Sequence, residues 1–292
     1  MENTRKVKRI LLAPEVMMGD IKLRQALPVG DLEQISPFIL LHHFDKEMLP
    51  GEAKFNVPPH PHRGFSPITF MFEGAVEHED SLGNKKVIHD NEVQWINAGR
   101  GIIHSEKADK DFAERGGHYQ GIQLWVNTPR ALKMQPASYQ PITSNEIVLI
   151  EKEGVEFRLV SGKYNDYEGP ANSDVFTAML RMKANSHYTF NFPATSNVVF
   201  YVLEGEMKIN NIQVAKQHNL IVFESGDGDI LLEASSDAKL LLMAGEPIDE
   251  PLVSYGPFVM TSQTEIMEAM RDYQMGKMGF LAASSGGEVQ DS

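Results

Sequence analysis

The chain has 292 residues, of which 42% are hydrophobic, and its 27 basic and 40 acidic side chains give a formal charge of −13 at pH 7. This excess of negative charge repels phosphate backbones, so we expect no direct binding to nucleic acid. The chain contains no cysteine, which excludes disulfides, thiolate metal ligands, cysteine nucleophiles and iron–sulfur clusters.

The N-terminal segment MENTRKVKRILLAP contains a basic cluster of Arg5, Lys6, Lys8 and Arg9, which we interpret as the solvated edge of a strand. The apolar run in this segment, Ile10–Ala13, is too short for a signal peptide or a membrane span. The sequence therefore predicts a cytoplasmic protein without a membrane partner.

Short apolar runs of alternating polarity, separated by Gly, Asn, Asp and Pro, make up most of the chain. They predict many short β-strands, the pattern of a β-sandwich or a β-barrel. The clearest runs cover residues 68–72, 92–96, 122–126, 147–150, 175–180, 198–203 and 220–223. Residues 82–84 and 210–211 have the Gly and Asn typical of tight turns.

Two segments, Thr69–Gly74 and Phe200–Gly205, share an aromatic and aliphatic strand that ends in Glu-Gly and is followed by a predicted hairpin. This repetition indicates an internal duplication, and therefore two stacked β-barrels. The join is expected near residues 134–141, where Pro136 and Pro141 interrupt the strand pattern.

One segment near the C-terminus has the features of a helix. Ser262 and Glu265 form the sequence pattern of a capping box, and Gly276 suits the C-terminal cap. The residues expected together on one helical face are Ile266, Met267, Met270 and Tyr273. The small and polar segment after Phe280 is predicted to be a disordered tail.

Two short motifs, HPHRGF at residues 60–65 and AGRGIIHSE at residues 98–106, hold three of the ten histidines. Residues i and i+2 of a strand point to the same side, so His60 can converge with His62, and His104 with Glu106. Two such pairs on neighbouring strands would join three imidazole nitrogens and one carboxylate oxygen. This set suits divalent iron, copper, nickel, manganese or zinc, and differs from a closed, cysteine-rich structural zinc site. A six-coordinate ion would keep two positions for a substrate or dioxygen.

The other histidines have simpler interpretations, and a lone His-x-His pair is itself more often two surface or core residues. Two such pairs beside Gly and Pro nevertheless favour a metal site. His78 is interpreted as a solvated turn residue, and His42–His43 as a pair that packs near the N-terminal barrel. Four further histidines are expected to be structural or exposed: His89, His118, His187 and His218.

Side chains near the motifs allow more than one interpretation. Arg63 and Arg100 either orient the carboxylate or a bound anion, or hold the loop through a salt bridge. Four aromatic residues are expected in the core, with one or two lining a cavity where they stack on an aromatic substrate. These are Phe70, Phe72, Trp95 and Trp125.

Six motifs of the chain closely resemble the pirin family of the cupin superfamily, from the first strand to about residue 280. They are His60–Phe65, His78–Asn84, Val93–Trp95, Ala98–Glu106, Gln123–Asn127 and Gly256–Met260. The resemblance implies an all-β bicupin, with two face-to-face antiparallel jelly-roll barrels, to which the sequence pattern adds a short C-terminal helix. We expect a metal-binding N-terminal cupin barrel over residues 1–135, a C-terminal cupin barrel over residues 136–280 and a tail over residues 281–292.

The resemblance also implies one divalent metal ion, foremost Fe(II), with copper, nickel, manganese or zinc as alternatives. Its ligands would be His60, His62, His104 and Glu106, the same four residues that the spacing selects.

The chain departs from the general cupin pattern in two places. General cupins have a carboxylate ligand three to four residues after the His-x-His pair, where this chain has Ser66 and Pro67, so Glu106 must serve instead, as it does in pirins. Pirins often have Glu at the position of Ser66, a change that would affect the pocket wall or the residues around the ligands without touching the metal. Alignment of the two repeats places Asn191 and Pro193 opposite the first two histidines, so the second barrel is expected to have lost its metal site.

The resemblance to pirins implies a quercetin 2,3-dioxygenase-like oxidoreductase, which cleaves a flavonol such as quercetin with dioxygen. A metal Lewis acid would lower the pKa of the flavonol 3-hydroxyl, and Glu106, the expected catalytic residue, would accept its proton.

The alternative is an iron-binding, redox-sensitive regulatory protein that binds another protein without turnover, as a transcriptional or metabolic co-regulator. The acidic charge suits a basic protein partner. Dioxygen consumption with a suitable phenol distinguishes the two functions.

Overall fold

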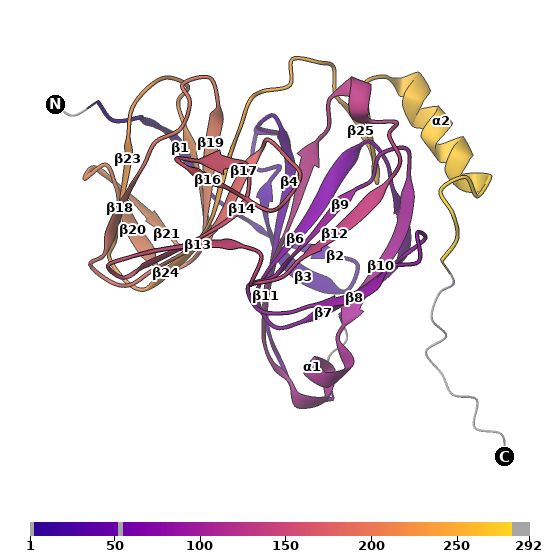
Figure 1. Cartoon of the computed structure of the whole chain (residues 1–292), viewed down its shortest axis with the longest axis horizontal. Coiled ribbons are helices and arrows are strands. Elements are labelled where there is room, and N and C mark those ends of the chain that lie inside the picture. Colours follow the sequence, from indigo (N-terminus) through magenta and orange to yellow (C-terminus); the bar gives the residue numbers. More distant parts are fainter. Residues whose placement is uncertain (1–2, 52–54, 282–292) are drawn as a thin grey trace.

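The computed structural model describes residues 3–51 and 55–281, and consists of two β-barrels side by side, with short helices at their edges (Figure 1). Each predicted run coincides with a strand, although the runs at 92, 147 and 175 begin one residue before it, so the all-β fold with two cupin barrels is confirmed. Of the predicted tail, residues 282–292 lie outside the described residues. Within the described part, neither α-helix has the length and apolar character needed to cross a membrane.

The first barrel consists of a seven-stranded and a four-stranded sheet. The seven-stranded sheet has the order β12 (Ser138–Ile142), β9 (Val93–Asn97), β6 (Phe65–Glu73), β11 (Gly117–Asn127), β4 (Phe38–Met48), β3 (Ile21–Leu27) and β2 (Glu15–Met18). The four-stranded sheet has the order β5 (Asn56–His62), β10 (Ile102–Ala108), β7 (Val76–Asp80) and β8 (Lys85–Ile88). Helix α1 (Lys110–Arg115) connects β10 to β11, and a 3₁₀ turn covers Arg130–Leu132.

The second barrel repeats this arrangement. Its seven-stranded sheet has the order β1 (Val7–Leu12), β22 (Asn219–Phe223), β19 (Asn197–Glu204), β24 (Ala238–Gly245), β17 (Phe176–Met182), β14 (Val155–Ser161) and β13 (Val148–Lys152). Its four-stranded sheet has the order β18 (His187–Phe190), β23 (Ile230–Ala234), β20 (Glu206–Ile209) and β21 (Gln213–Lys216). Two ribbons, β15 (Lys163–Tyr164) with β16 (Tyr167–Glu168) and β25 (Val253–Tyr255) with β26 (Phe258–Met260), complete the strands.

The two large sheets pack face to face through one apolar cluster. It joins Ile68, Phe70 and Phe72 of β6 to Tyr201 of β19 and Leu241 of β24. Because strand side chains alternate, the other face of β6 points into the first barrel, where Thr69 is buried. The interior of the first barrel therefore holds polar groups close to its apolar wall.

The interior of the second barrel is filled by apolar side chains, with Phe157, Phe176, Phe190, Phe192 and Phe200 packed edge to face or tilted. Dense aromatic packing of this kind leaves no space or polar donors for a metal ion. The predicted loss of a metal site from this barrel stays a prediction that the packing supports.

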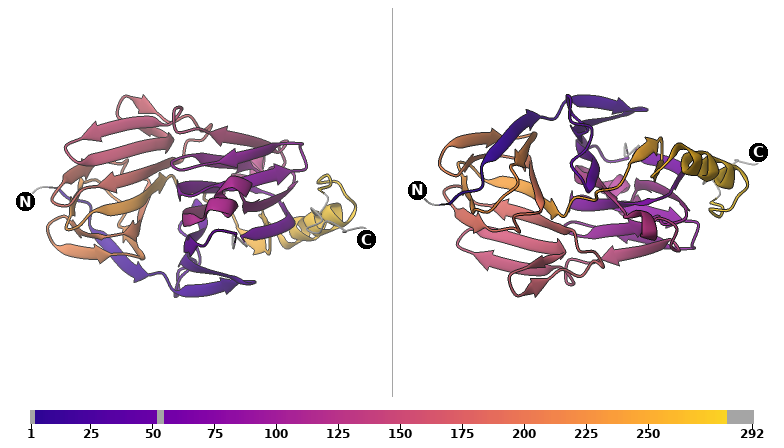
Figure 2. Two further views of the ribbon diagram at one scale, coloured as in Figure 1. Left: turned by 90° about the horizontal axis from the view of Figure 1, so that it is seen from below. Right: turned by 90° about the horizontal axis from the view of Figure 1, so that it is seen from above.

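The first strand of each half of the chain belongs to the barrel formed by the other half, and Figure 2 shows the N-terminal strand on the second barrel. Strand β1 pairs antiparallel with β22 of the second barrel, with Ile10 opposite Ile221. Strand β12, which follows residue 135, pairs with β9 of the first barrel. The division at residue 135 stays a prediction that does not include these exchanges.

The basic cluster at the N-terminus is not simply a solvated edge, because Arg5 is only 2% exposed. Its guanidinium donates to the carbonyl oxygens of Phe192, Pro193 and Ser196 at 3.3, 2.7 and 3.3 Å. An arginine has five N–H donors in a planar fork, so backbone carbonyls of a loop can satisfy it away from water. Lys6 remains exposed, as predicted.

Helix α2 (Gln263–Gln274) confirms the predicted helix, and Ser262 caps it by accepting from the Glu265 backbone N–H. The predicted helical face is only partly right. Ile266 is 2% exposed and packs with Ile103 of the first barrel, whereas Met267 is 62% exposed. Ala269 takes the buried position that the sequence pattern assigned to larger side chains.

An ion pair also holds α2 against the first barrel. The Nη1 and Nη2 atoms of Arg63 each donate to Oδ2 of Asp272 at 3.1 Å, and Nε donates to the carbonyl of Arg100 at 2.6 Å. Of the two interpretations of Arg63, the structure therefore shows the salt bridge. The pKa of Asp272 lies below its ordinary value, mainly through the hydrogen bond from Lys277, with the Arg63 bonds adding to it.

Replacing Asp272 by asparagine should lower the free energy of unfolding by about 1–2 kcal/mol at pH 7, because a charged hydrogen bond becomes a neutral one. A lowered folded-state pKa means that this stabilisation is present above the ordinary pKa of 3.8 and is lost as the pH falls through the folded-state value. Urea unfolding at pH 7 and pH 3 measures both the loss of stability and its dependence on pH, with Asp166→Asn as an exposed control. If the wild type and Asp272→Asn differ in free energy of unfolding by the same amount at both pH values, this account is wrong.

Candidate metal centre

Three of the four predicted ligands converge in the first barrel. Strands β5 and β10 pair antiparallel, and their register places His104 opposite His60, and Ile102 opposite His62. One ring nitrogen from each of the three histidines lies within 4.8 Å of the other two. The Nε2 atoms of His60 and His62 are 3.1 Å apart, a separation that suits two ligands on one ion with bonds of about 2.1 Å.

Gly64 and the prolines explain the sequence around this pair. Pro58, Pro59 and Pro61 fix the backbone angles of β5. Gly64 has φ +87°, and a Cβ atom at this position would collide with the carbonyl oxygen of Val259. The turn after His62 therefore requires a glycine, both for its backbone angle and for the close approach of β26.

A buried lysine holds the same turn from the other side. Lys133 is 1% exposed, and its ammonium group donates to the carbonyl of Gly64 at 2.7 Å, to Asn127 Oδ1 at 2.6 Å and to the carbonyl of Val259 at 3.1 Å. Burial lowers the pKa of Lys133 to about 8. The sequence did not indicate this residue, since two of its three acceptors, the carbonyls of Gly64 and Val259, are distant along the chain.

Burial keeps two histidines of the cluster, His62 and His104, neutral. His62 is 2% exposed and His104 is 0% exposed, whereas His60 is partly exposed and forms the accessible edge. Desolvation, together with the neighbouring imidazoles, lowers the pKa of His62 and of His104 well below the ordinary value. A neutral imidazole with a free lone pair is the form that binds a metal ion.

Hydrogen bonds also select the tautomers. Nδ1 of His60 donates to the carbonyl of Pro58 at 2.9 Å, which leaves Nε2 unprotonated. Nε2 of His104 is buried and has no hydrogen-bond partner among the described residues. Such an orphaned nitrogen, aimed at two other imidazoles, fits a metal ligand better than a structural core histidine.

His78 is not the solvated turn residue that we predicted. It is 0% exposed in β7, its Nε2 donates to Asp80 Oδ2 at 3.0 Å, and its Nδ1 lies 3.4 Å from Nδ1 of His104. Because the Nε2–H of His78 is donated to Asp80, Nδ1 of His78 is free to accept the Nδ1–H of His104. The lone pair of His104 is then on Nε2, which faces the cluster. The chain Asp80–His78–His104 thus orients the imidazole of His104, one of the predicted ligands.

The rest of the HEDSLGN motif supports this chain. Asp80 accepts from the Leu82 backbone N–H at 2.9 Å and from Nδ2 of Asn84 at 2.9 Å. The ring of Tyr139 stacks on His78 at 4.2 Å with an interplanar angle of 3°. The hairpin therefore fixes the carboxylate, and the tyrosine fixes the imidazole plane.

Glu106 lies beside the three histidines but is not one of the donors in that group. It is 4% exposed, and Oε1 accepts from Thr69 Oγ1 at 3.3 Å and from Nε2 of Gln94. A β-bulge between His104 and Glu106 breaks the regular register of β10 against β5. Its role as the fourth ligand stays a prediction, and Thr69 and Gln94 are polar partners that sequence analysis did not identify.

The four predicted aromatic residues divide into two groups. Phe70, Phe72 and Trp95 lie in the cluster between the barrels. Trp125 instead lies with its ring 5.3 Å from His62 and 4.3 Å from Phe65. Its Nε1 is buried, without an acceptor in the described part of the chain. Trp125 is therefore the one of the four that lies at the metal centre.

The remaining histidines lie outside this group. His89 and His187 are exposed, as predicted, and His42 bonds to Gln25 in the first barrel. His118 and His218, which were expected to be structural or exposed, are half-buried and have polar partners. His118 contacts Glu73 and Asp45 at 2.8 and 2.7 Å, and His218 lies with His43 and Asp45.

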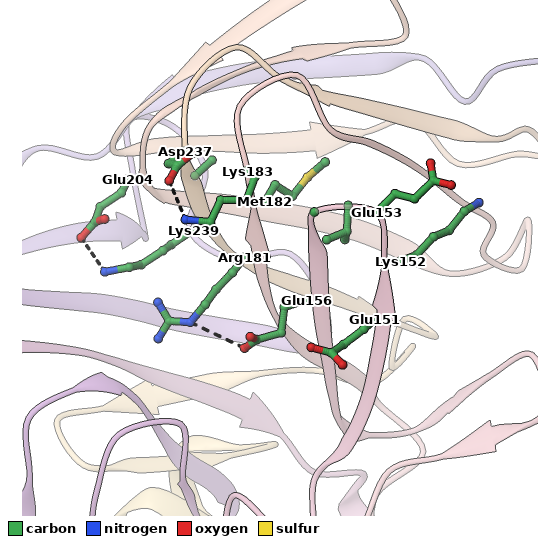
Figure 3. A pocket seen from close by; sticks show the side chains of 13 residues that line it. Glu151, Lys152, Glu153, Glu156, Arg181, Met182, Lys183, Glu204, Asp237 and Lys239 are labelled. Atoms are coloured by element: carbon green, nitrogen blue, oxygen red, sulfur yellow. Dashed lines mark hydrogen bonds and ion pairs between the residues drawn. The ribbon is translucent and has the colours of Figure 1, made fainter.

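A cavity of 610 Å³ on the second barrel contains none of the predicted ligands (Figure 3). Six of its charged side chains form pairs, Lys183 with Asp237 at 2.8 Å, Lys239 with Glu204 at 2.9 Å and Arg181 with Glu156 at 3.8 Å. These three basic groups are neutralised by their partners and offer little free charge to a ligand.

Comparison with known proteins agrees with this arrangement. The family model described as Pirin matches residues 20–126, and the model described as Pirin C-terminal cupin domain matches residues 177–279. Pirin-1 of Arabidopsis thaliana is 34% identical over 286 residues, which are 95% of this chain and 95% of that protein. The crystal structure of quercetin 2,3-dioxygenase from Acinetobacter baumannii is 31% identical, with a TM-score of 0.89 over 96% of this chain and 100% of that chain.

The crystal structure of the bacterial pirin YhhW from Escherichia coli in complex with nickel(II) is 20% identical, with a TM-score of 0.65 over 82% of this chain and 100% of that chain. At this identity, the likeness shows the fold alone. The matches to both pirin models and to nearly the full length of Pirin-1 go further, and they show that this chain belongs to the pirin family.

Proposed function

We propose that the chain is a metal-dependent dioxygenase that cleaves a flavonol such as quercetin, with His60, His62, His104 and Glu106 holding the metal ion. The observation that carries the proposal is the orphaned Nε2 of buried His104, which lies in one group with the imidazoles of His60 and His62. The similarity to the Acinetobacter baumannii quercetin 2,3-dioxygenase supports the reaction class.

The donor set fits one divalent ion, and Fe(II) is the ion that we propose first, with copper, nickel, manganese and zinc as alternatives. When bound, the ion would act as a Lewis acid that lowers the pKa of the flavonol 3-hydroxyl. Glu106 would accept the proton from that hydroxyl. Thr69 and Gln94 hold one oxygen of this carboxylate, and so orient it for the transfer.

The walls of the centre suit a flat aromatic molecule. Trp125 stands beside His62 and offers a ring face for stacking, and buried Phe65 packs behind it. The unpartnered Nε1–H of Trp125 would donate to a carbonyl or hydroxyl oxygen of the substrate. Access would be from the side of His60, the partly exposed histidine of the group.

The test is dioxygen uptake by protein reconstituted anaerobically with ferrous iron, before and after addition of quercetin. The wild type should take up dioxygen only with quercetin, and His62→Ala should reduce this uptake to background because it removes a central ligand. His187→Gln, which removes an exposed histidine, should behave as the wild type.

If wild-type protein that holds one iron per chain takes up no dioxygen with quercetin, the proposed dioxygenase function is wrong. This result would instead favour the iron-binding regulatory protein, whose affinity for a protein partner should then follow the oxidation state of the iron.

A further inference from the structure

A second cluster of metal-ligating side chains lies where the two barrels meet, and it shares no residue with the centre described above. His43 and Asp45 alternate along β4, on the same face as Leu41, which packs against the second barrel. His218 comes from the turn between β21 and β22 of the second barrel. One donor atom from each of the three residues lies within 4.8 Å of the other two.

His43 is buried, but only one of its two ring nitrogens has a hydrogen-bond partner among the described residues. It is 0% exposed, and its Nδ1 lies 3.1 Å from the hydroxyl of Tyr201. With Nδ1–H donated to that oxygen, Nε2 has a free lone pair. Nε2 is buried and finds no partner in residues 3–51 and 55–281. An unpartnered buried nitrogen is unfavourable by about 1–3 kcal/mol, so this one indicates a ligand.

Asp45 is oriented toward the same point. Its Oδ1 accepts from Nε2 of His118 at 2.7 Å, while Oδ2 lies 4.0 Å from Nε2 of His43. His118 is itself held by Glu73, at 2.8 Å from Nδ1. Two of the three candidate ligands thus have a second residue that fixes their orientation, as metal ligands in proteins generally do.

We propose that His43, Asp45 and His218 form a second metal site, which takes one divalent transition-metal ion such as zinc, cobalt, nickel or iron. Two imidazoles and one carboxylate are a set that such ions accept, and the set leaves further coordination positions open. The three residues line a cavity of 650 Å³, which also contains Glu15, Asp20 and Tyr119. The open positions would face this cavity.

Binding requires a small contraction of the cluster. Ligands on one ion with bonds of about 2.1 Å lie roughly 3 Å apart, so the two more exposed side chains must approach His43. Asp45 and His218 can do so, because they lie at the rim while His43 is fixed in the interface. Arg24 is paired with His43 in the β3–β4 register, and its positive charge disfavours a metal cation nearby. Glu15 neutralises part of that charge, since its Oε2 lies 3.6 Å from Nη2 of Arg24.

The ion would connect the two barrels, since two of its ligands belong to the first barrel and the third to the second. Any ligand that binds only the folded state stabilises that state. Occupancy should therefore raise the melting temperature, an effect separate from any dioxygenase activity.

The experiment is equilibrium dialysis of chelator-treated full-length protein against Co²⁺ alone, with bound metal counted per chain. Wild-type protein should bind two ions. Asp45→Asn and His218→Gln should each bind one, with binding of the second ion at least tenfold weaker. His62→Ala should also bind one ion, because the site between the barrels does not use that histidine. His187→Gln, the matched exposed control, should bind two.

Melting curves of these proteins, with and without Co²⁺, check the result independently. In the His62→Ala background, Co²⁺ should raise the melting temperature, and addition of His218→Gln should abolish the rise. A wild type that binds one ion, together with a His62→Ala variant that binds none, overturns the second site and supports the first. Two ions in His62→Ala and one in Asp45→Asn would instead overturn the assignment of the first centre.

Discussion

Glu106→Gln should lower the turnover of quercetin about 100-fold, the range expected when a general base is removed. Glutamine has nearly the same shape as glutamate, so Thr69 and Gln94 keep a partner for its side-chain oxygen, and the fold should be preserved. What is lost is the negative charge that would accept the flavonol proton. The measurement is the steady-state rate of dioxygen uptake at saturating quercetin, with iron content determined for the same samples.

Iron content separates the two roles of Glu106. A base that is only a weak ligand gives a slow enzyme with normal iron, whereas an essential ligand gives an enzyme that has lost its iron. Glu79→Gln, on the same sheet but paired with Lys85 at the surface, is the matched control and should keep full activity. Unchanged turnover in Glu106→Gln would remove Glu106 from catalysis.

The ligand positions could be predicted from the sequence because their geometry is local. The two-residue period of a strand places His60 and His62 on one side, whatever the rest of the fold does. That β5 pairs with β10 could be expected from the cupin resemblance, and the structure places His104 directly opposite His60. The β-bulge between His104 and Glu106 could not be predicted from the alternation of residues along the strand. After this bulge, the carboxylate of Glu106 accepts hydrogen bonds from Thr69 and Gln94.

His78 shows why other parts of the centre could not be predicted. In the sequence it stands between Glu77 and Glu79, which indicates a solvated hairpin. In the structure β7 alternates, so Val76, His78 and Asp80 are buried and the two glutamates lie on the outer side. The alternation of residues 76, 78 and 80 was present in the sequence. It did not predict a buried face, because aspartates such as Asp80 are rarely buried unless they are paired.

The cluster between the barrels could not be predicted for a different reason. His43 and Asp45 lie on one strand, but His118 comes near Asp45 only because β11 pairs with β4. His218 joins them only because one barrel packs on the other. The same is true of Arg5, whose acceptors are carbonyls almost 190 residues away. Contacts of this kind depend on tertiary structure, and no local pattern encodes them.

Replacing His78 should weaken metal binding at the first centre by about 10- to 100-fold, the usual effect of removing a residue that orients a ligand. Phenylalanine at this position can still stack on Tyr139 but cannot accept the Nδ1 proton of His104. That proton would then be buried without a partner, and rotation of His104 to satisfy it would turn Nε2 away from the cluster. The measurement is the Kd for Co²⁺ at the first centre, by competition with a chelator.

His78→Gln separates orientation from packing, because the glutamine oxygen can still accept from His104. If His78 acts by orienting the ligand, Gln should recover most of the affinity that Phe loses, although Phe keeps the aromatic packing better. Equal losses in both variants, accompanied by lower melting temperatures without metal, would show instead that His78 only fills the core. Because Asp80 also closes the hairpin through Leu82 and Asn84, its replacement would confuse the two effects. The imidazole, rather than the carboxylate, is therefore the position at which the orientation of His104 can be tested cleanly.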